Sequence, residues 1–239
     1  MKYFIDLHIH TTLSPCADND MTPNNIVNMA MLKGLDFIAI TDHNSARNVE
    51  AVIECARGKG IIIVPGMEVE SAEEVHMVCL FPNLDAVYNM EELVQVHLPN
   101  LKNDVKIFGA QVIYNSRDEI IGYDDRLLVT ATSLSIDRIK ASVEDLGGIA
   151  IPSHVDRQSF SVISNLGFIP PELNFTVVEL SKHTNKVAFL ANNPFLSRYM
   201  MIQNSDAHHL EDISEAEEAI DLANKSIGDL LNCFQLKNS

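Results

Sequence analysis

Basic residues are scarce in this sequence of 239 residues. There are 17 Lys and Arg against 33 Asp and Glu, which gives a formal net charge of -16 at pH 7. Proteins that bind the phosphate backbone of a long nucleic acid do so through clustered Lys and Arg side chains. We therefore expect no long nucleic acid among the partners. A small anionic substrate held by metal ions is compatible with this charge.

Long apolar runs and paired cysteines are also lacking. The longest apolar runs, such as 61–64, are far shorter than the ~20 residues that span a bilayer, and nothing at the N-terminus resembles a signal peptide. The four cysteines, Cys16, Cys55, Cys79 and Cys233, are widely spaced, with no C-x-x-C pair. These absences predict a cytoplasmic protein with reduced thiols and no membrane partner.

The chain does contain a repeating order of short apolar strand, polar residues and helical pattern. Seven segments have the composition of buried strands: the apolar run within 1–10, then 37–40, 61–64, 75–81, 148–152, 176–180 and 199–203. Helical patterns separate most of them, for example after Thr22 and Pro23, at 45–57 and at 135–146. Strands that alternate with helices predict a largely parallel sheet.

Polar residues follow these strands almost everywhere. Parallel α/β barrels build their active sites just past the carboxyl ends of their strands, whereas an open doubly wound sheet concentrates ligand residues at one switch point. We therefore predict an α/β fold, a closed or nearly closed barrel of seven units. Residues 82–133 break the pattern with a helix at 91–98 and two strands at 106–114 and 120–130. We interpret 82–133 as an insertion that rims the active site of one domain, 1–239, and 211–221 as a solvated helix face.

The first strand carries half of a metal site. Side chains two apart on a strand point the same way, so His8 and His10 face together. Imidazoles suit zinc, iron, nickel or copper, and manganese where carboxylates join them. Further metal-binding side chains lie at or near the later strand ends: His43, Glu68, His76, His154, Asp206 and His208. A zinc site needs only three or four protein ligands, so this set is enough for two or three ions.

Six short motifs carry a family resemblance. They are D-L-H-I-H-T at 6–11, I-T-D-H-N at 40–44, P-G-M-E at 65–68, H-M-V-C-L at 76–80, S-H at 153–154 and S-D-A-H at 205–208. In their order and chemistry the sequence resembles the polymerase and histidinol phosphatase (PHP) family of metal-dependent phosphoesterases. The resemblance covers nearly the whole chain apart from 82–133. It implies a distorted (β/α)7 barrel that holds up to three divalent ions, here zinc, manganese or iron.

The resemblance also implies roles for single residues. The implied metal ligands are His8, His10, His43, Glu68, His76, His154, Asp206 and His208, and Asp42 would orient an imidazole from behind. Relatives often have Ser-Asp-Gly or a histidine after the first pair, whereas this chain has Ser14-Pro15-Cys16-Ala17-Asp18. We predict Asp18 as the additional ligand. Cys16 is the alternative, and its soft thiolate would favour zinc or iron over manganese.

The implied reaction is that of a metal-dependent phosphoric ester hydrolase. We expect cleavage of a small phosphorylated molecule, a nucleotide or metabolite phosphate, by attack of a metal-activated hydroxide. Asp206 would hold a metal and accept a proton from the attacking water, while Arg157 would clamp a phosphoryl oxygen. His209 would assist the leaving oxygen.

Two other classes of protein stay open. An amidohydrolase-type enzyme also uses an H-x-H pair and a late Asp, but it usually has a bridging lysine or fewer ligands. A non-catalytic, metal-stabilised accessory module would be expected to have lost ligands. The sequence leaves open the substrate, the native metal and the oligomeric state. His183 is a weaker candidate for the site, and His97 is expected to be structural or exposed.

Overall fold

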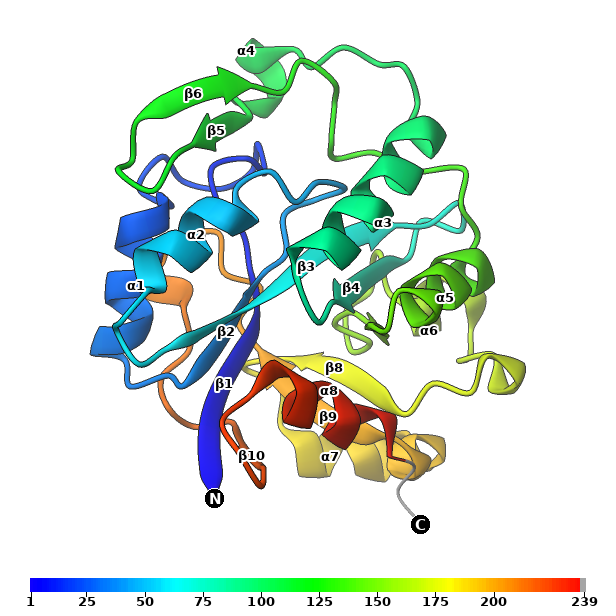
Figure 1. The fold of residues 1–239 in the computed structure, drawn as a ribbon. Coiled ribbons are helices and arrows are strands. Elements are labelled where there is room, and N and C mark those ends of the chain that lie inside the picture. Colours follow the sequence, from blue (N-terminus) through cyan, green and yellow to red (C-terminus); the bar gives the residue numbers. More distant parts are fainter. Residues whose placement is uncertain (237–239) are drawn as a thin grey trace.

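A curled sheet forms the centre of the molecule in the computed structural model, which describes residues 1–236 (Figure 1). Its six strands lie in the order β10-β1-β2-β3-β4-β7. Their bounds are β1 (Lys2–Ile9), β2 (Phe37–Ile40), β3 (Ile62–Glu70), β4 (His76–Leu80), β7 (Ile149–Pro152) and β10 (Ala219–Asp221). Two parallel strands, β8 (Val177–Ser181) and β9 (Met200–Asn204), form a second sheet.

Backbone contacts join the two sheets into a ring. Ile9 forms a parallel bridge with Ala207 just beyond β9, and the N–H of Val155 beyond β7 donates to the carbonyl of Glu179 on β8 at 2.9 Å. The fold is therefore an α/β fold of the distorted (β/α)7 barrel type, as predicted. All seven predicted strands are present, and β10 is an additional edge strand.

One strand runs against the predicted direction. β1, β2 and β3 are parallel, but β4 pairs antiparallel with both β3 and β7. The parallel direction that we predicted for most strands is wrong at β4. Only 71–75 connects β3 to β4, and a parallel crossover needs about a dozen residues or more. Because β4 is reversed, His76 at its start lies at the edge where the neighbouring strands end.

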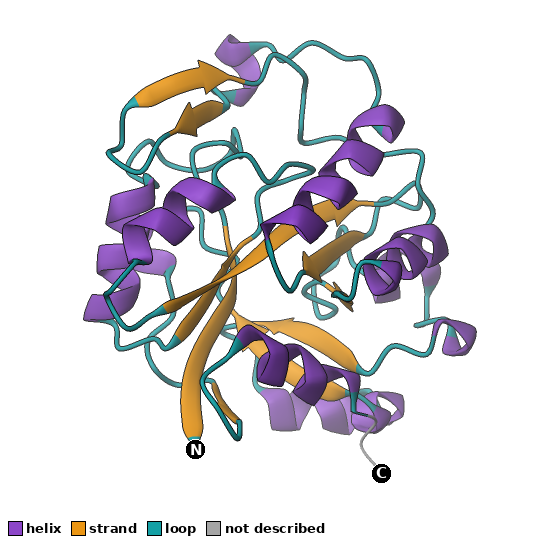
Figure 2. Ribbon diagram, viewed as in Figure 1, coloured by secondary structure: helices purple, strands orange, loops and turns teal. Residues whose placement is uncertain are grey.

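Helices cover the outside of the curled sheet, and one more closes its amino end (Figure 2). The outer apolar core joins α1 and α2 to β2, for example through Ile26, Val52 and Ile38. The inner core contains Leu7, Val78 and Leu230 of α8. The helices are α1 (Pro23–Leu32), α2 (Val49–Ala56), α5 (Ile136–Asp145), α6 (Val162–Leu166), α7 (Lys186–Asn192) and α8 (Ile227–Gln235), with 3-10 turns at Pro171–Leu173, Pro194–Arg198 and Leu210–Asp212.

Residues 82–133 form α3 (Leu84–His97), α4 (Val105–Phe108) and a hairpin of β5 (Val112–Tyr114) and β6 (Ile120–Tyr123). The hairpin lies beyond the carboxyl end of β1 (Figure 1). α3 starts earlier than predicted because the Asn83 side chain caps it. The predicted strand 106–114 is wrong in its first part. There the Asp104 side chain accepts from the N–H of Lys106, which starts a one-turn helix, and Gly109 at φ 99° ends it.

The segment 211–221 is not the predicted helix. It leaves a 3-10 turn and becomes β10, which pairs antiparallel with the start of β1. The buried carboxylate of Asp6 accepts from the N–H of Ser214 at 2.9 Å, and Lys33 Nζ donates to the carbonyl of Glu211 at 2.9 Å. These contacts from outside the segment hold its backbone in an open path.

Membrane-spanning helices and disulfide bonds were both expected to be absent. Within residues 1–236, no helix has the length and apolar character needed to cross a membrane. All four cysteines are free, and Cys55 and Cys79 are buried in the core.

Candidate metal centre

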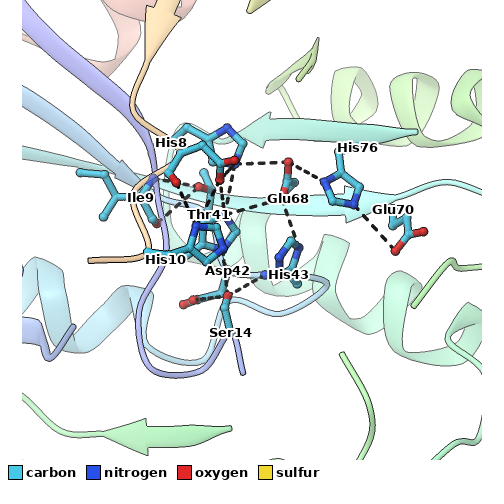
Figure 3. Close-up of polar contacts among 12 residues, drawn as sticks. His8, Ile9, His10, Ser14, Thr41, Asp42, His43, Glu68, Glu70 and His76 are labelled. Carbon is cyan, nitrogen blue, oxygen red and sulfur yellow. Dashed lines mark hydrogen bonds and ion pairs between the residues drawn. The ribbon is translucent and has the colours of Figure 1, made fainter. Parts of the chain in front are cut away.

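Glu68 lies at the centre of a cluster of imidazoles at the carboxyl edge of the barrel (Figure 3). Its Oε1 lies 3.2 Å from His8 Nε2, 3.1 Å from His76 Nδ1 and 3.5 Å from His154 Nε2. Its Oε2 lies 3.1 Å from His43 Nδ1 and 3.6 Å from His10 Nε2. The curled sheet thus brings together side chains from five different strand ends.

Asp206, just beyond β9, closes the cluster. Its Oδ1 lies 3.2 Å from His8 Nε2 and 3.1 Å from His10 Nε2, and 3.7 Å from His208 Nδ1. A barrel requires this meeting of β1 with β9, the last of the seven predicted strands. All eight implied metal ligands therefore converge at one site. Asp18, the predicted additional ligand, does not join them.

Left-handed backbone turns the chain at three of these strand ends. Asn44 (φ 51°), His154 (φ 30°) and Asp206 (φ 51°) all have positive φ although none is glycine. Such conformations cost of order 1–3 kcal/mol each and concentrate at functional sites. Here they direct His154 and Asp206 into the cluster directly after β7 and β9.

Glu179 on β8 holds His8 from behind. Both of its oxygens lie 3.0 Å from His8 Nδ1, and it also accepts from the N–H of His154 at 3.0 Å and from Asn204 Nδ2 at 2.7 Å. Our sequence analysis missed this residue. The available signal was a carboxylate in the otherwise apolar strand 176–180, because a buried charge there requires partners.

Asp42 acts on His10 through Ser14. The Ser14 hydroxyl donates to Asp42 Oδ1 at 2.7 Å, which leaves its lone pairs to accept from His10 Nδ1 at 2.8 Å. Asp42 also accepts from the N–H and the hydroxyl of Thr11, both at 2.7 Å. The Asp42 carboxylate therefore fixes the ring orientation of His10 through the Ser14 hydroxyl.

The cluster has more hydrogen-bond acceptors than donors, which indicates a site for cations. His8 and His10 direct their Nδ1 atoms to Glu179 and Ser14, so in the neutral rings Nε2 carries a lone pair. Those lone pairs face carboxylate oxygens. Both oxygens of Glu68 and Oδ1 of Asp206 are buried without a hydrogen-bond partner. Acceptors that face acceptors at this distance are stabilised by a proton or a metal ion between them, so the donor set fits divalent metals.

Three groups of ligand atoms lie close enough to hold an ion, with all atoms of a group within 4.8 Å of one another. They are His8, His10, Glu68 and Asp206; His43, Glu68 and His76; and His10, His43 and His208. The cavity beside them measures about 170 Å³ and is lined in addition by His154, Arg157, Ser159 and Phe160. A larger cavity of about 400 Å³ lies at the amino ends of β7 and β8, away from these ligands.

The charges of the cluster suit metal binding. Burial raises the pKa values of Glu68 and Asp206, but the surrounding histidines outweigh burial and hold both pKa values well below their usual range. Burial lowers the pKa of His10 well below its usual value, and the charges of His208 and His43 add to this. For His8, burial is outweighed by Glu179, Glu68 and Asp206, and its pKa is raised. Ionised carboxylates and a neutral His10 are the forms that bind metals.

The two candidates in the loop after β1 lie differently. The Asp18 carboxylate is half-exposed and faces His209, with Oδ2 3.8 Å from His209 Nδ1, and neither residue belongs to the three groups. Burial raises the pKa of the Cys16 thiol, but the nearby imidazoles of His208 and His43 outweigh burial and lower this pKa to about 6. Cys16 does not belong to the three groups either. Arg157, half-exposed, places Nη1 2.6 Å from Asp206 Oδ2.

The family profile of the PHP domain matches residues 6–164. The chain belongs to the PHP domain family. Members of this family are metal-dependent hydrolases, which agrees with the ligand clusters described above. The matched stretch contains six of the eight implied ligands, and Asp206 and His208 lie beyond it.

This PHP chain matches only part of the length of its curated relatives. Two uncharacterized proteins of Methanocaldococcus jannaschii are 28% and 34% identical over 48% and 34% of the chain, which covers 15% and 51% of their lengths. The 5'-3' exoribonuclease Rnm of Salmonella typhimurium is 33% identical over 35% of the chain and 28% of its own length. The chain thus spans at most about half of these curated relatives.

Solved structures share the PHP fold over almost the whole chain. The lesion-specific endonuclease EndoQ of Pyrococcus furiosus superposes with a TM-score of 0.73 at 18% identity, over 98% of this chain and 56% of that one. A candidate metal-dependent phosphoesterase of Bifidobacterium adolescentis gives 0.61 at 16% identity, over 98% and 97%. An amidohydrolase of Chromobacterium violaceum gives 0.58 at 19%, over 98% of each chain.

These findings correct the exclusion of long nucleic acid. Endonuclease Q has been solved with a 27-mer duplex that carries an abasic lesion at its active site, and Rnm is named as an exoribonuclease. The exclusion was wrong because net charge is a sum over the whole surface. A cluster of bound cations can attract a phosphate locally even on an acidic protein.

Proposed function

We propose that this PHP protein hydrolyses phosphoester bonds of nucleotides and nucleic-acid strands, with two or three zinc, manganese or iron ions in the cluster. The observation that carries the proposal is the acceptor-only cluster around Glu68 with Arg157 beside it. Buried carboxylates and neutral imidazoles hold cations, and a neighbouring guanidinium suits a phosphoryl group. The contact of Asp206 with Arg157 is what joins the two halves of the site.

The size of the cavity sets what can be enclosed. Pockets that enclose a drug-sized ligand measure about 300–1,000 Å³, and the site cavity measures about 170 Å³. It therefore suits a phosphoryl group and leaves the rest of the substrate outside. This is compatible with a mononucleotide and with a strand. The nuclease names among the relatives favour nucleic acid as the source of the phosphate.

The residues around the cavity have separable roles in this proposal. Bound divalent ions would lower the pKa of a water molecule and offset the charge on the phosphoryl oxygens. Asp206 accepts a proton through the carboxylate that already faces His8 and His10. Arg157 Nη1 donates to Asp206, and Arg157 Nη2 would donate to a phosphoryl oxygen. We propose that His209, half-exposed beside Asp18, gives a proton to a leaving oxygen.

The segment 82–133 is proposed to form the rim on which the rest of the substrate lies, within one barrel domain. Its backbone is tied to the loops that carry the ligands: Asn44 Nδ2 donates to the carbonyls of Leu128 at 2.7 Å and Thr130 at 3.0 Å. The N–H of Val112 donates to the carbonyl of Thr12 at 3.0 Å. These contacts support a fixed rim over β1 and β2.

The test is hydrolysis by metal-loaded protein of a panel that contains short RNA and DNA with 5' or 3' phosphates, mononucleotides, sugar phosphates, and amide and lactone substrates. We expect phosphoester cleavage, its loss in Asp206→Asn, and a drop in kcat/KM of roughly 100-fold or more in Arg157→Ala, the size of losing one charged donor to a transition state. Arg138→Ala, on the exposed face of α5, is the matched control. Cleavage of amides or lactones without any phosphoester would favour the amidohydrolase alternative.

A further inference from the structure

An aromatic side chain lies at the edge of the site cavity. Phe160 lines this cavity, and 43% of the residue is exposed. Its ring stacks on the imidazole of His76, with the two ring centroids 4.7 Å apart and an angle of 21° between the ring planes. One face of the phenyl ring is therefore covered by His76. The exposed fraction belongs to the other side of the ring, which faces outward.

The backbone holds Phe160 in an unfavourable conformation. Its φ is 55°, in the left-handed region, where a bulky side chain is an outlier. The N–H of His76 donates to the carbonyl of Phe160 at 2.9 Å, and the buried hydroxyl of Ser161 donates to the carbonyl of Val155 at 3.2 Å. Such conformations persist only where the surroundings enforce them, and they concentrate at binding and active sites. The loop thus fixes the position of the ring before a substrate binds.

The same loop forms the exposed edge of the cavity. Among the residues that line the cavity, the exposed ones are Arg157, Ser159 and Phe160. Arg157 and Phe160 are three residues apart, so their Cα atoms lie within ~10 Å of each other. A guanidinium that suits a phosphoryl group and an open aromatic face therefore lie side by side at the entrance.

The size of the cavity decides what meets this aromatic face. A volume of about 170 Å³ suits a phosphoryl group, so the part of the substrate that adjoins the phosphate lies against the exposed edge. In a nucleotide that part is a hydroxylated sugar and a base with flat, apolar faces. The base is the group that an open phenyl ring fits, because offset stacking of two rings buries apolar surface on both.

We propose that Phe160 is a substrate-binding residue whose open face stacks on the nucleobase next to the phosphate that Arg157 holds. The inference deepens the proposed function and rests on it, because it takes the site as one that binds a nucleotide phosphate. Every base has an aromatic face, so this contact selects nucleotides over sugar phosphates without choosing among the bases. Loss of one such stack corresponds to roughly 5–150-fold in affinity.

The test measures binding to the metal-loaded full chain by calorimetry. The ligands are the 5'-phosphonates of adenosine and uridine and that of ribose, which lacks a base; carbon replaces the ester oxygen in each, so none can be hydrolysed. We expect the wild type to bind the nucleoside phosphonates about 5–150-fold more tightly than the base-free one. Phe160→Leu should lose most of this difference and keep its affinity for the base-free ligand. Phe195→Leu is the matched control, since Phe195 is 41% exposed but precedes the amino end of β9.

A second variant keeps the test decisive if Phe160→Leu folds poorly. The chain contains no tryptophan, so Phe160→Trp keeps a stacking surface and makes it the only indole in the protein. A base stacked on this indole quenches its fluorescence. The adenosine phosphonate should therefore quench the emission of Phe160→Trp and the base-free phosphonate should not, while Phe195→Trp should respond to neither.

Three results overturn the proposal. The wild type binds all three ligands equally, Phe160→Leu weakens all three by the same factor, or the two ligands quench Phe160→Trp alike. An equal loss for all ligands would make the ring a cover for His76 or a surface for the sugar. Failure of the proposed function is a different result. Base-dependent binding through Phe160 without cleavage of any phosphoester would refute the hydrolase and leave the stacking contact in place.

Discussion

The hydroxyl of Ser14 accepts from His10 Nδ1 at 2.8 Å while it donates to Asp42 at 2.7 Å. This contact fixes the hydrogen of His10 on Nδ1 and leaves Nε2 free to bind an ion. We predict that Ser14→Ala weakens metal binding about 10–100-fold, as other losses of outer partners do, with little change in fold. Calorimetric titration with Zn²⁺ measures it. Ser197→Ala is the control, since Ser197 is exposed and its hydroxyl donates to the carbonyl of Pro194. Equal affinities in the two variants would refute the role.

Glu179 satisfies donors from three different residues, and we predict that Glu179→Gln damages both the fold and the site. The amide keeps the shape but turns one acceptor into a donor, which then faces His8, His154 or Asn204. An unsatisfied buried group costs about 1–3 kcal/mol, so the free energy of unfolding of metal-free protein should fall by that amount. Denaturant unfolding with and without Zn²⁺ measures both effects. The prediction fails if unfolding and metal affinity are both unchanged.

Alkylation should distinguish Cys16 from the other thiols. The thiolate is the reactive form, and the pKa of Cys16 is about 6, so its reaction with iodoacetamide in metal-free protein should rise through pH 6 and level off near pH 7. Burial raises the pKa of Cys233 above 9.0, so its rate should still be rising at pH 9. Mass spectrometry of digested protein follows each site separately. A Cys16 rate that parallels that of Cys233 would contradict the prediction.

Gly109 is predicted to hold the Cys16 loop in place. Its φ is +99°, and an added Cβ would lie 2.4 Å from the Pro15 carbonyl oxygen, so Gly109→Ala must displace the loop. Gly58→Ala is the matched control, since Gly58 also has positive φ (+74°) but nothing within 4 Å. Each variant should lose about 1 kcal/mol of stability from the backbone alone. Only Gly109→Ala should also weaken metal binding, because the displaced loop carries Ser14, which orients His10. Calorimetric titration with Zn²⁺ measures this effect.

Much of this structure could be predicted from local sequence. Seven apolar segments followed by polar residues gave the strands, and the imidazoles at their ends gave the site. The reversal of β4 could have been predicted too, from the short connection 71–75.

Other features depend on contacts between distant segments. The course of the loop that carries Cys16 and Asp18 is decided by the packing of Pro15 against Gly109 and by the hydrogen bond from the Asp18 N–H to the carbonyl of His208. No pattern within the loop contains that information. The course of 211–221 is likewise set by Asp6 and Lys33 from outside it.

The bridge between Ile9 and Ala207 also sets an order of events during synthesis. His8 and His10 leave the ribosome early, but the carboxylate that completes their group, Asp206, is among the last parts of the barrel to be made. Domains generally fold as units once their segments are available. β1 must therefore wait for β9, and the four-ligand site can capture its ion only after Asp206 has been made. A nascent or truncated chain that ends after residue 164 would hold the matched family segment and still lack this site.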